Sequence, residues 1–157
     1  QGHFDNKKRK LYLFFEKSGL NVKNSQLADM LSDDQRADVT MCDSAEPKSI
    51  DELREEYKVN VMAVDKYPGS VEHGVKYLQD LDEIIIDPQR CPLAATEFIN
   101  YALDTNRYGE VISKYPDKNN HSIDAVRYML SQQIKSDRIA RRKSKFRAKP
   151  LPVVSRW

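Results

Sequence analysis

Short apolar runs that end in charged or turn-forming residues recur along the chain and predict β-strands. The run Leu-Tyr-Leu-Phe-Phe within residues 9–16 is apolar on both faces, which favours a buried central strand. Residues 4–8 carry Asp and Asn and predict a hairpin turn from a preceding strand at residues 1–4. Further strands are expected at residues 39–43, 59–64 and 83–87, the first and last of them buried.

Between these runs, apolar residues recur every three or four positions and predict helices. In the clearest case, Ile123, Val126, Leu130 and Ile134 fall on one side of a helical wheel. Strands separated by helices indicate an α/β fold. A helix is expected from residue 24 or 25 to 31, with Leu27, Met30 and Leu31 inward, followed by a loop at residues 33–35. A second is expected from a capping box formed by Ser49 and Glu52 to residue 57. Two more are expected, one that begins at Ser70 and in which Gly74 allows close packing, and one from Pro92 to residue 103.

Two element ends carry side chains that can bind a metal ion. Asp43 ends the strand at residues 39–43, where open α/β sheets place ligand sites, although an Asp that merely forms a turn is the alternative. His121 and Asp124 are three residues apart at a helix start, opposite the apolar stripe. The alternative is that His121 is only a solvated residue next to the helix cap and that Asp124 only interacts favourably with the helix dipole. Together the three side chains favour a site, which requires Asp43 and Asp124 to approach each other.

Three blocks of sequence resemble a known family. They are D-S-A-E-P-K at residues 43–48, K-Y-P-G-S-V-E-H-G at 66–74 and N-H-S-I-D-A-V-R-Y at 120–128. Their order and spacing are similar to those of the C-terminal nuclease domain of the large subunit of tailed-phage terminases. The resemblance implies a ribonuclease H-like α/β fold, a mixed central sheet flanked by helices. It also implies a metal-dependent endonuclease that cuts concatemeric double-stranded viral DNA during genome packaging, by two-metal phosphodiester hydrolysis.

The resemblance also assigns the site. Asp43, Asp124 and His121 match catalytic, metal-ligating positions of the family, and two Mg²⁺ or Mn²⁺ ions are implied. Carboxylate ligands suit such hard cations. Family members begin the domain with a strand that carries a further catalytic aspartate, and nothing before Asp5 resembles it. We therefore expect the first strand to be truncated in this chain, and Asp5, in its turn, to be no replacement ligand.

The partners implied by the resemblance are double-stranded DNA, the terminase small subunit and the portal protein. The expected location is the cytoplasm of the infected host cell, at the packaging motor on the procapsid. The sequence contains no G-x-x-x-x-G-K phosphate-binding loop, so the packaging ATPase of the family, which lies upstream, is expected to be absent from this chain. No apolar run is long enough to predict a membrane span or a signal peptide.

Composition and charge divide the chain unevenly. With 39% hydrophobic and 32% charged residues, a chain of this length suits one globular domain. Residues 135–157 contain nine Lys or Arg and one Asp, a net charge of +8, which leaves −6 for residues 1–134 given the overall +2. We expect a nuclease domain at residues 1–134 and a basic, disordered tail at 135–157 that contacts DNA or an assembly partner. Cys42 and Cys91 lack the spacing of a zinc site.

A second hairpin is expected between residues 104 and 120, with Gly109 at its turn. Together with Lys66 at the end of the strand at 59–64, its Arg107, Tyr108 and Lys114 are candidate contacts for the DNA backbone. The alternatives are a plain connecting hairpin and an ordinary solvated lysine.

Two other functions compete with the nuclease. A catalytically weak or silent terminase fragment, acting in DNA binding or in assembly of the packaging motor and portal, is the stronger alternative, because the first aspartate is missing. A phosphotransfer domain would need a Gly-rich phosphate loop, which the sequence lacks. Because close carboxylates repel, we also expect alanine at Asp43 or Asp124 to leave stability unchanged or slightly raised.

Overall fold

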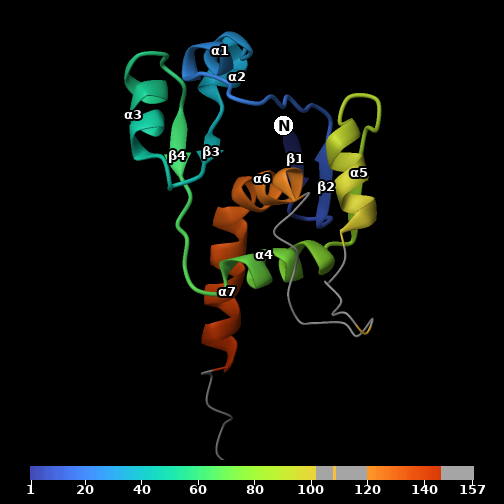
Figure 1. Cartoon of the computed structure of the whole chain (residues 1–157). Coiled ribbons are helices and arrows are strands. Elements are labelled where there is room, and N and C mark those ends of the chain that lie inside the picture. The colour runs from blue at the N-terminus through green and yellow to red at the C-terminus, as the bar shows by residue number, and fades with distance from the viewer. Residues whose placement is uncertain (102–107, 109–119, 146–157) are drawn as a thin grey trace, which may run out of the picture.

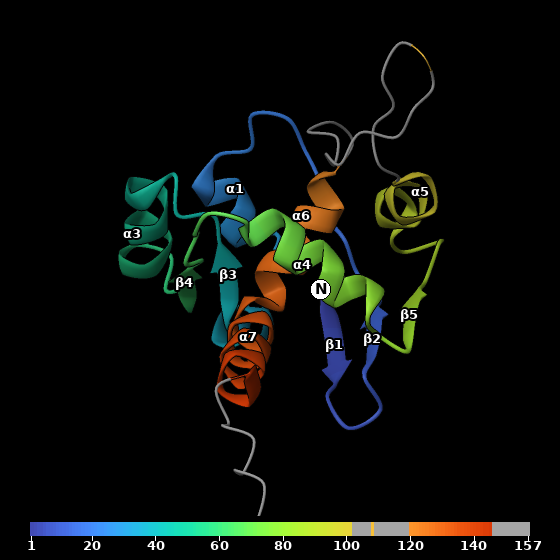
Figure 2. The ribbon, with the colours of Figure 1, turned by 90° about the horizontal axis from the view of Figure 1, so that it is seen from below.

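The described strands form two sheets. The computed structural model describes residues 1–101, 108 and 120–145. β1 (Gly2–Asp5), β2 (Lys10–Leu13) and β5 (Glu83–Ile86) form one sheet in the order β1-β2-β5, with β1 antiparallel and β5 parallel to β2. β3 (Thr40–Cys42) and β4 (Val61–Ala63) form a separate parallel sheet. The mixed strand directions implied by the family resemblance are confirmed (Figures 1 and 2).

The β1–β2 hairpin forms where the sequence predicts it. One carboxylate oxygen of Asp5 accepts hydrogen bonds from the backbone N–H groups of Lys7 and Lys8, each at 3.0 Å. This local role agrees with the interpretation of Asp5 as a turn residue. β2 lies between β1 and β5, and its Leu11 is fully buried, so the predicted central strand is confirmed.

Two helix starts differ from the prediction. Residues 33–35 are helical because Ser32 and Gln35 form a reciprocal cap, with the Ser32 hydroxyl accepting from the Gln35 N–H at 3.3 Å. The next helix begins at Pro47 rather than at Ser49, since the fixed φ of proline suits the first helical turn. The helices are α1 (Asn24–Asp29), α2 (Asp33–Ala37), α3 (Pro47–Glu55), α4 (Ser70–Gln79), α5 (Pro92–Asn100), α6 (His121–Met129) and α7 (Ser131–Lys145).

Burial also differs from the prediction in three places. β3 is half-buried throughout rather than fully buried: α1 and α3 pack on its small sheet, while Met41 and Met62 line an open cavity with α6 and α7. In α1 the buried residue is Ala28, whereas Met30, expected inward, is exposed. Ile85 in β5 is exposed as well, so this strand alternates as a sheet with one packed face does.

Helix α6 lies between the two sheets (Figures 1 and 2). Its predicted stripe is confirmed: Ile123, Val126 and Leu130, together with Ile134 of α7, are buried in the larger core against β2, α4 and α5. A smaller core lies between α1, α3 and the β3–β4 sheet. Because α6 also contacts β3, it connects the two halves of the molecule.

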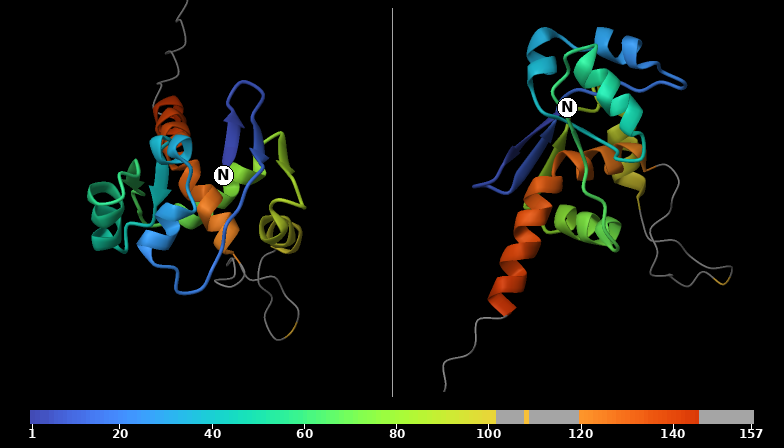
Figure 3. Two further views of the ribbon diagram at one scale, coloured as in Figure 1. Left: turned by 90° about the horizontal axis from the view of Figure 1, so that it is seen from above. Right: turned by 90° about the vertical axis from the view of Figure 1, so that its left-hand side faces the viewer.

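The basic C-terminal segment begins as a helix. α7 crosses the boundary expected at residue 134 and continues to Lys145. The helix extends away from the rest of the molecule (Figure 3). A salt bridge from Arg141 to Asp80, at the end of α4, helps to hold it, and Arg141 also pairs with Asp137 one turn earlier on α7. Residues 146–157 lie outside the described part. None of the described helices is long and apolar enough to cross a membrane.

Two leucines at opposite extremes of burial should differ in their effect on stability. Leu130 is 1% exposed and Leu20 is 95% exposed. We expect Leu130→Ala to lower the free energy of unfolding by about 2–5 kcal/mol, because it opens a cavity against β2 and α4, and Leu20→Ala to change it by less than about 0.5 kcal/mol. Urea unfolding followed by circular dichroism measures both. Equal effects would show that α6 does not form the centre of the core.

Candidate active site

Two parallel strands place the first pair of charged residues. Asp43 follows β3 and Lys66 follows the end of β4, and the two strands are hydrogen-bonded neighbours with Cys42 opposite Ala63. Strand ends of a parallel pair meet at one edge of the sheet, so the two side chains emerge together. Helix α6 contacts β3 and brings Tyr128 to the same edge.

The Asp43 carboxylate is held by three donors. The Lys66 ammonium lies 2.6 Å from Oδ1 and 2.7 Å from Oδ2 of Asp43. The Tyr128 hydroxyl donates to Oδ2 at 3.1 Å, and the backbone N–H of Ala45 donates to Oδ1 at 2.9 Å. The side chains of Asp43 and Lys66 remain 42% and 43% exposed. The carboxylate is therefore fixed in direction yet open to solvent.

These contacts shift the ionisation of the groups involved. The hydrogen bond from Lys66, reinforced by the Ala45 N–H and the Tyr128 hydroxyl, lowers the pKa of Asp43. The reciprocal bond to Asp43 raises the pKa of Lys66. Burial, followed by the negative charges of Asp43 and then Asp124, raises the pKa of Tyr128. Both carboxylates thus act on one hydroxyl, and Asp43 is ionised and Tyr128 protonated at neutral pH.

Asp124 is paired with a buried arginine. Arg127, one helical turn later on α6, makes an ion pair with Asp124 through Nη1 and donates to the backbone oxygen of Ser70 from Nη2 at 3.3 Å. The Arg127 side chain is only 6% exposed, and its Nε has no hydrogen-bond partner among the described residues. A buried guanidinium needs a counter-ion, so Asp124 has a structural role besides any chemical one.

Gly74 makes room for this arginine. A Cβ added at Gly74 would lie 2.5 Å from Arg127 Nε and 3.0 Å from its Cγ and Cδ. The predicted close packing at Gly74 is therefore confirmed, and the group that packs there is a charged side chain of α6.

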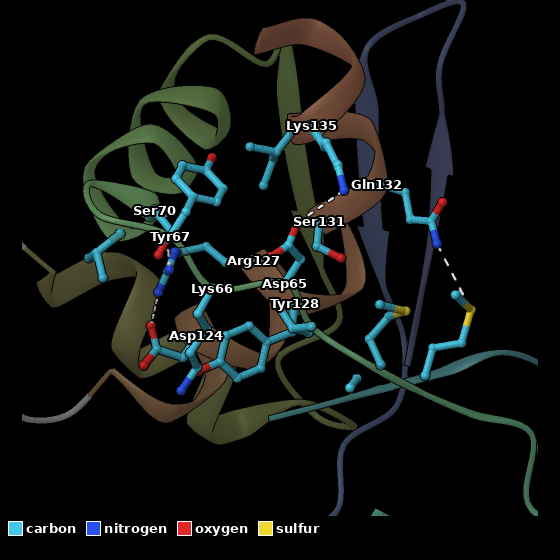
Figure 4. A pocket seen from close by; sticks show the side chains of 16 residues that line it. Asp65, Lys66, Tyr67, Ser70, Asp124, Arg127, Tyr128, Ser131, Gln132 and Lys135 are labelled. Carbon is cyan, nitrogen blue, oxygen red and sulfur yellow. Dashed lines mark hydrogen bonds and ion pairs between the residues drawn. The ribbon is translucent and has the colours of Figure 1, made fainter. Parts of the chain in front are cut away.

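A cavity of about 420 Å³ lies beside these residues. Figure 4 shows its lining, with Arg127 directed at Asp124 and Lys66 next to the Tyr128 ring. Lys135 of α7 also reaches this cavity and pairs with Asp65 at 3.0 Å. Asp43 lies at its edge, through Lys66 and Tyr128. The cavity is open and mixed in character, as expected for a site that admits part of a large substrate.

His121 lies elsewhere. It is exposed at the first position of α6 and lines a different cavity, which Leu13, Leu93 and Met30 also border. The helix start that carries His121 is held by Glu97 of α5, whose Oε2 accepts from the Ser122 N–H at 2.6 Å. Asp124 and Lys66 thus line the same cavity as Tyr128, which contacts Asp43, whereas His121 lines the other cavity.

Asp43 and Asp124 could provide some of the ligands that a divalent metal ion needs. No group of three or more His, Cys, Asp or Glu close enough to hold a metal ion occurs among the described residues. Mg²⁺, however, is often bound by one or two protein carboxylates together with waters and substrate phosphate oxygens. Asp43 supplies both of its oxygens to a cation in this structure, the Lys66 ammonium. The donor chemistry therefore suits a divalent ion, with ligands still to be supplied by other groups.

Of the other DNA-contact candidates, Tyr108 is 71% exposed, and Arg107 and Lys114 lie outside the described residues, as does most of the hairpin expected between residues 104 and 120. Sequence reasoning missed the roles of Arg127 and Tyr128. The i, i+3 spacing of Asp124 and Arg127 signals an ion pair on a helix. No sequence signal indicates that Tyr128 reaches Asp43, because that contact spans 85 positions.

The two carboxylates should differ in their effect on stability. Without metal, Asp124→Asn should lower the free energy of unfolding by about 2 kcal/mol, because it leaves the buried Arg127 without a counter-ion. Asp43→Asn should lower it by less than about 1 kcal/mol, because its ion pair is solvent-exposed. This revises the expectation that neither carboxylate matters for stability. Urea titrations in EDTA provide the measurement, and equal losses would contradict the distinction.

The lowered pKa of Asp43 depends chiefly on Lys66. We expect Lys66→Met to raise the pKa of Asp43 toward its ordinary value, and Lys135→Met, which removes a cation paired with Asp65, to leave it unchanged. Because the folded pKa is depressed, the stabilisation from this pair is present above the unfolded pKa of about 3.9 and is lost as the pH falls through the folded value. Carboxyl-carbon NMR titration measures the shift.

Comparison with known proteins identifies the family. Residues 2–132 match the model of the terminase RNase H-like domain. The large terminase subunit of Bacillus phage SPP1 is 38% identical over 135 residues, which cover 85% of this chain and 32% of that protein. This chain thus spans about a third of the length of that curated relative.

A solved structure supports the same assignment. The crystal structure of the large terminase nuclease domain from bacteriophage SPP1 with bound Mn superimposes with a TM-score of 0.78 at 37% identity, covering 84% of this chain and 76% of that one. The expected resemblance and the ribonuclease H-like fold are confirmed. The chain belongs to the terminase RNase H-like domain family, the nuclease domains of phage terminase large subunits.

Proposed function

We propose that this chain is a metal-dependent endodeoxyribonuclease that cuts concatemeric double-stranded viral DNA during genome packaging. The observation that carries the proposal is the hydrogen bond to Asp43 from Tyr128, which lies one turn after Asp124 on α6, at the edge of an open cavity that Asp124 lines. The similarity to a nuclease domain solved with bound Mn supports the use of a divalent ion. Two-metal hydrolysis with Mg²⁺ or Mn²⁺ is the proposed reaction.

Each residue of the site has a defined task in this proposal. Asp43 and Asp124 would hold the ions with their carboxylates. The Tyr128 hydroxyl keeps one oxygen of Asp43 in place, and Arg127 fixes the direction of Asp124. A bound divalent ion would supply an activated water and stabilise negative charge on the phosphate. His121, one turn before Asp124 on α6, is proposed to ligate an ion or to orient the attacking water.

The DNA is proposed to be held mainly by its backbone. Lys66 at the cavity and Tyr108, with Arg107 and Lys114, are the proposed contacts, which read no base sequence. Residues 1–134 carry a net charge of −6, so affinity for DNA must come from local cations and from the basic segment that α7 begins. We therefore propose weakly selective cutting, with specificity supplied by other packaging proteins.

The wider setting is also proposed from the family. The whole enzyme would act with the terminase small subunit and the portal protein, at the packaging motor on the procapsid in the cytoplasm of the infected host cell. The similarity to the large terminase subunit of phage SPP1 supports this setting.

A weak or silent fragment remains the second candidate, because one observation favours it. The described residues bring together two carboxylates rather than three metal-binding groups, and each carboxylate is already paired with a cation. In this case the chain would bind DNA or assemble with the motor without cutting.

Plasmid nicking separates the two candidates. With Mn²⁺ present, the unmodified chain should nick supercoiled plasmid, and Asp43→Asn or Asp124→Asn should reduce the rate by about a hundredfold or more, because each removes a proposed metal ligand. Asp65→Asn is the matched control, since Asp65 lines the same cavity and pairs with Lys135. Its rate should stay within about threefold. Activity that persists in Asp43→Asn would overturn the assigned site, and no nicking by any form would favour the silent fragment.

A further inference from the structure

Three ion pairs surround the cavity beside the site. They are Lys66 with Asp43, Arg127 with Asp124, and Lys135 with Asp65. The first two involve the carboxylates that the proposed function assigns to metal ions. A carboxylate oxygen can accept more than one partner, but a divalent ion and a protein cation cannot occupy the same position in front of a carboxylate. A pair in which the protein cation blocks that position must therefore change when a metal ion binds.

Arg127 is not the group that moves. Its side chain is buried, its second nitrogen is anchored on the Ser70 carbonyl, and the space that it fills exists only because residue 74 is glycine. Ser70 and Gly74 belong to α4, so displacing Arg127 would disturb the packing of α4 against α6. Its ion pair also uses Nη1 and Oδ1, so Oδ2 of Asp124, which accepts a long 3.5 Å hydrogen bond from the Asn120 side chain, keeps room for another ligand.

Lys66 has the opposite properties. Its ammonium lies between both oxygens of Asp43, at 2.6 and 2.7 Å, and so occupies the coordination direction that a cation on this carboxylate would use. The side chain is nearly half exposed, and it stands at the end of a flexible four-carbon stem. It also lines the cavity, and in the same position its ammonium lies 5.7 Å from the centre of the Tyr128 ring.

We propose that Lys66 is an exchangeable counter-cation. In the metal-free protein it neutralises Asp43; on metal binding it leaves this carboxylate, swings into the cavity and binds a phosphate of the DNA backbone. The inference rests on the proposed function, because it requires a divalent ion at Asp43. Repulsion between the ion and the ammonium drives the exchange, and a DNA phosphate provides the negative charge that Lys66 then lacks.

The exchange makes metal and DNA binding depend on each other. The metal ion must displace Lys66, so the ion pair weakens metal binding to the free protein. Once DNA is present, the displaced ammonium gains a phosphate, and the same displacement becomes favourable. By linkage, metal should likewise strengthen the contribution of Lys66 to DNA affinity. The site would therefore assemble fully only when substrate and metal are both bound.

The first experiment measures metal binding by calorimetric titration of the full chain with MnCl₂. Lys66→Met should bind Mn²⁺ about two- to fivefold more tightly than the unmodified chain, because an exposed ion pair of this kind no longer competes. Lys135→Met is the matched control: it removes a lysine from the same cavity but from a different carboxylate, and its affinity should stay within about twofold. Thermal melts in EDTA verify that the variants are folded, and Lys66→Gln substitutes if the Met variant is not.

The second experiment measures binding of a short DNA duplex by fluorescence anisotropy, once in EDTA and once with Ca²⁺, used as a divalent ion that supports binding rather than cleavage. Lys66→Met should weaken DNA binding about threefold or more with Ca²⁺ and by less than about 1.5-fold in EDTA, where Lys66 is engaged by Asp43. Lys135→Met should have the same effect, large or small, in both conditions.

The outcomes separate this inference from the proposed function. If Asp43→Asn removes Mn²⁺ binding but Lys66→Met leaves it unchanged or weaker, Lys66 does not compete with the metal and only the exchange is wrong. Equal loss of DNA affinity in EDTA and in Ca²⁺ would mean a permanent contact and would also overturn the exchange. If Asp43→Asn leaves Mn²⁺ binding intact, the metal lies elsewhere and both the proposed site and the exchange fail.

Discussion

The buried ion pair between Arg127 and Asp124 is the constraint on which the site depends. An unpaired guanidinium is very unfavourable in a protein core, so Asp124 must stay close to it. The arginine also ties α6 to the first turn of α4 through Ser70 and fills the space above Gly74. With α6 fixed in this way, Tyr128 is directed at Asp43 on the neighbouring sheet. One side chain thus sets the relation between a helix, a second helix and a strand end.

Much of the fold follows from local sequence patterns. The hairpin with Asp5 in its turn and the apolar stripe of α6 are both present, because each depends on residues that are neighbours in the sequence. The structure differs from the prediction where two local sequence signals for a helix start or a loop compete. Ser32 and Gln35 form a helix cap in a polar stretch that we predicted to be a loop. Pro47 begins α3 two residues before the capping box predicted at Ser49. Burial of β3 depends on which helices cover it, and the sequence of the strand does not contain that information.

The candidate site could be predicted only in part for the same reason. Parallel neighbouring strands bring their ends together, so the proximity of Asp43 and Lys66 follows from topology. The partners Arg127 and Tyr128 depend on how α6 packs against β3 and α4, which is a tertiary property. His121 shows the same limit from the other direction: the helical spacing to Asp124 is as predicted, but His121 lines a different cavity. The spacing of residues on a helix determines the direction of their side chains relative to one another, whereas the packing of the helix determines which other residues they meet.

The hydrogen bonds between Glu97 and the start of α6 affect which changes in sequence length the domain can tolerate. Glu97 accepts from the backbone of Ser122 and Ile123 and so fastens the first turn of α6 directly to α5. The position of that turn is therefore set by a side chain of the preceding helix and does not rely on the linking segment alone. Insertions or deletions in the linking segment would change its length without moving Asp124, since loop closure depends only weakly on length. Evolution can accordingly alter that segment while the carboxylates of the site keep their places.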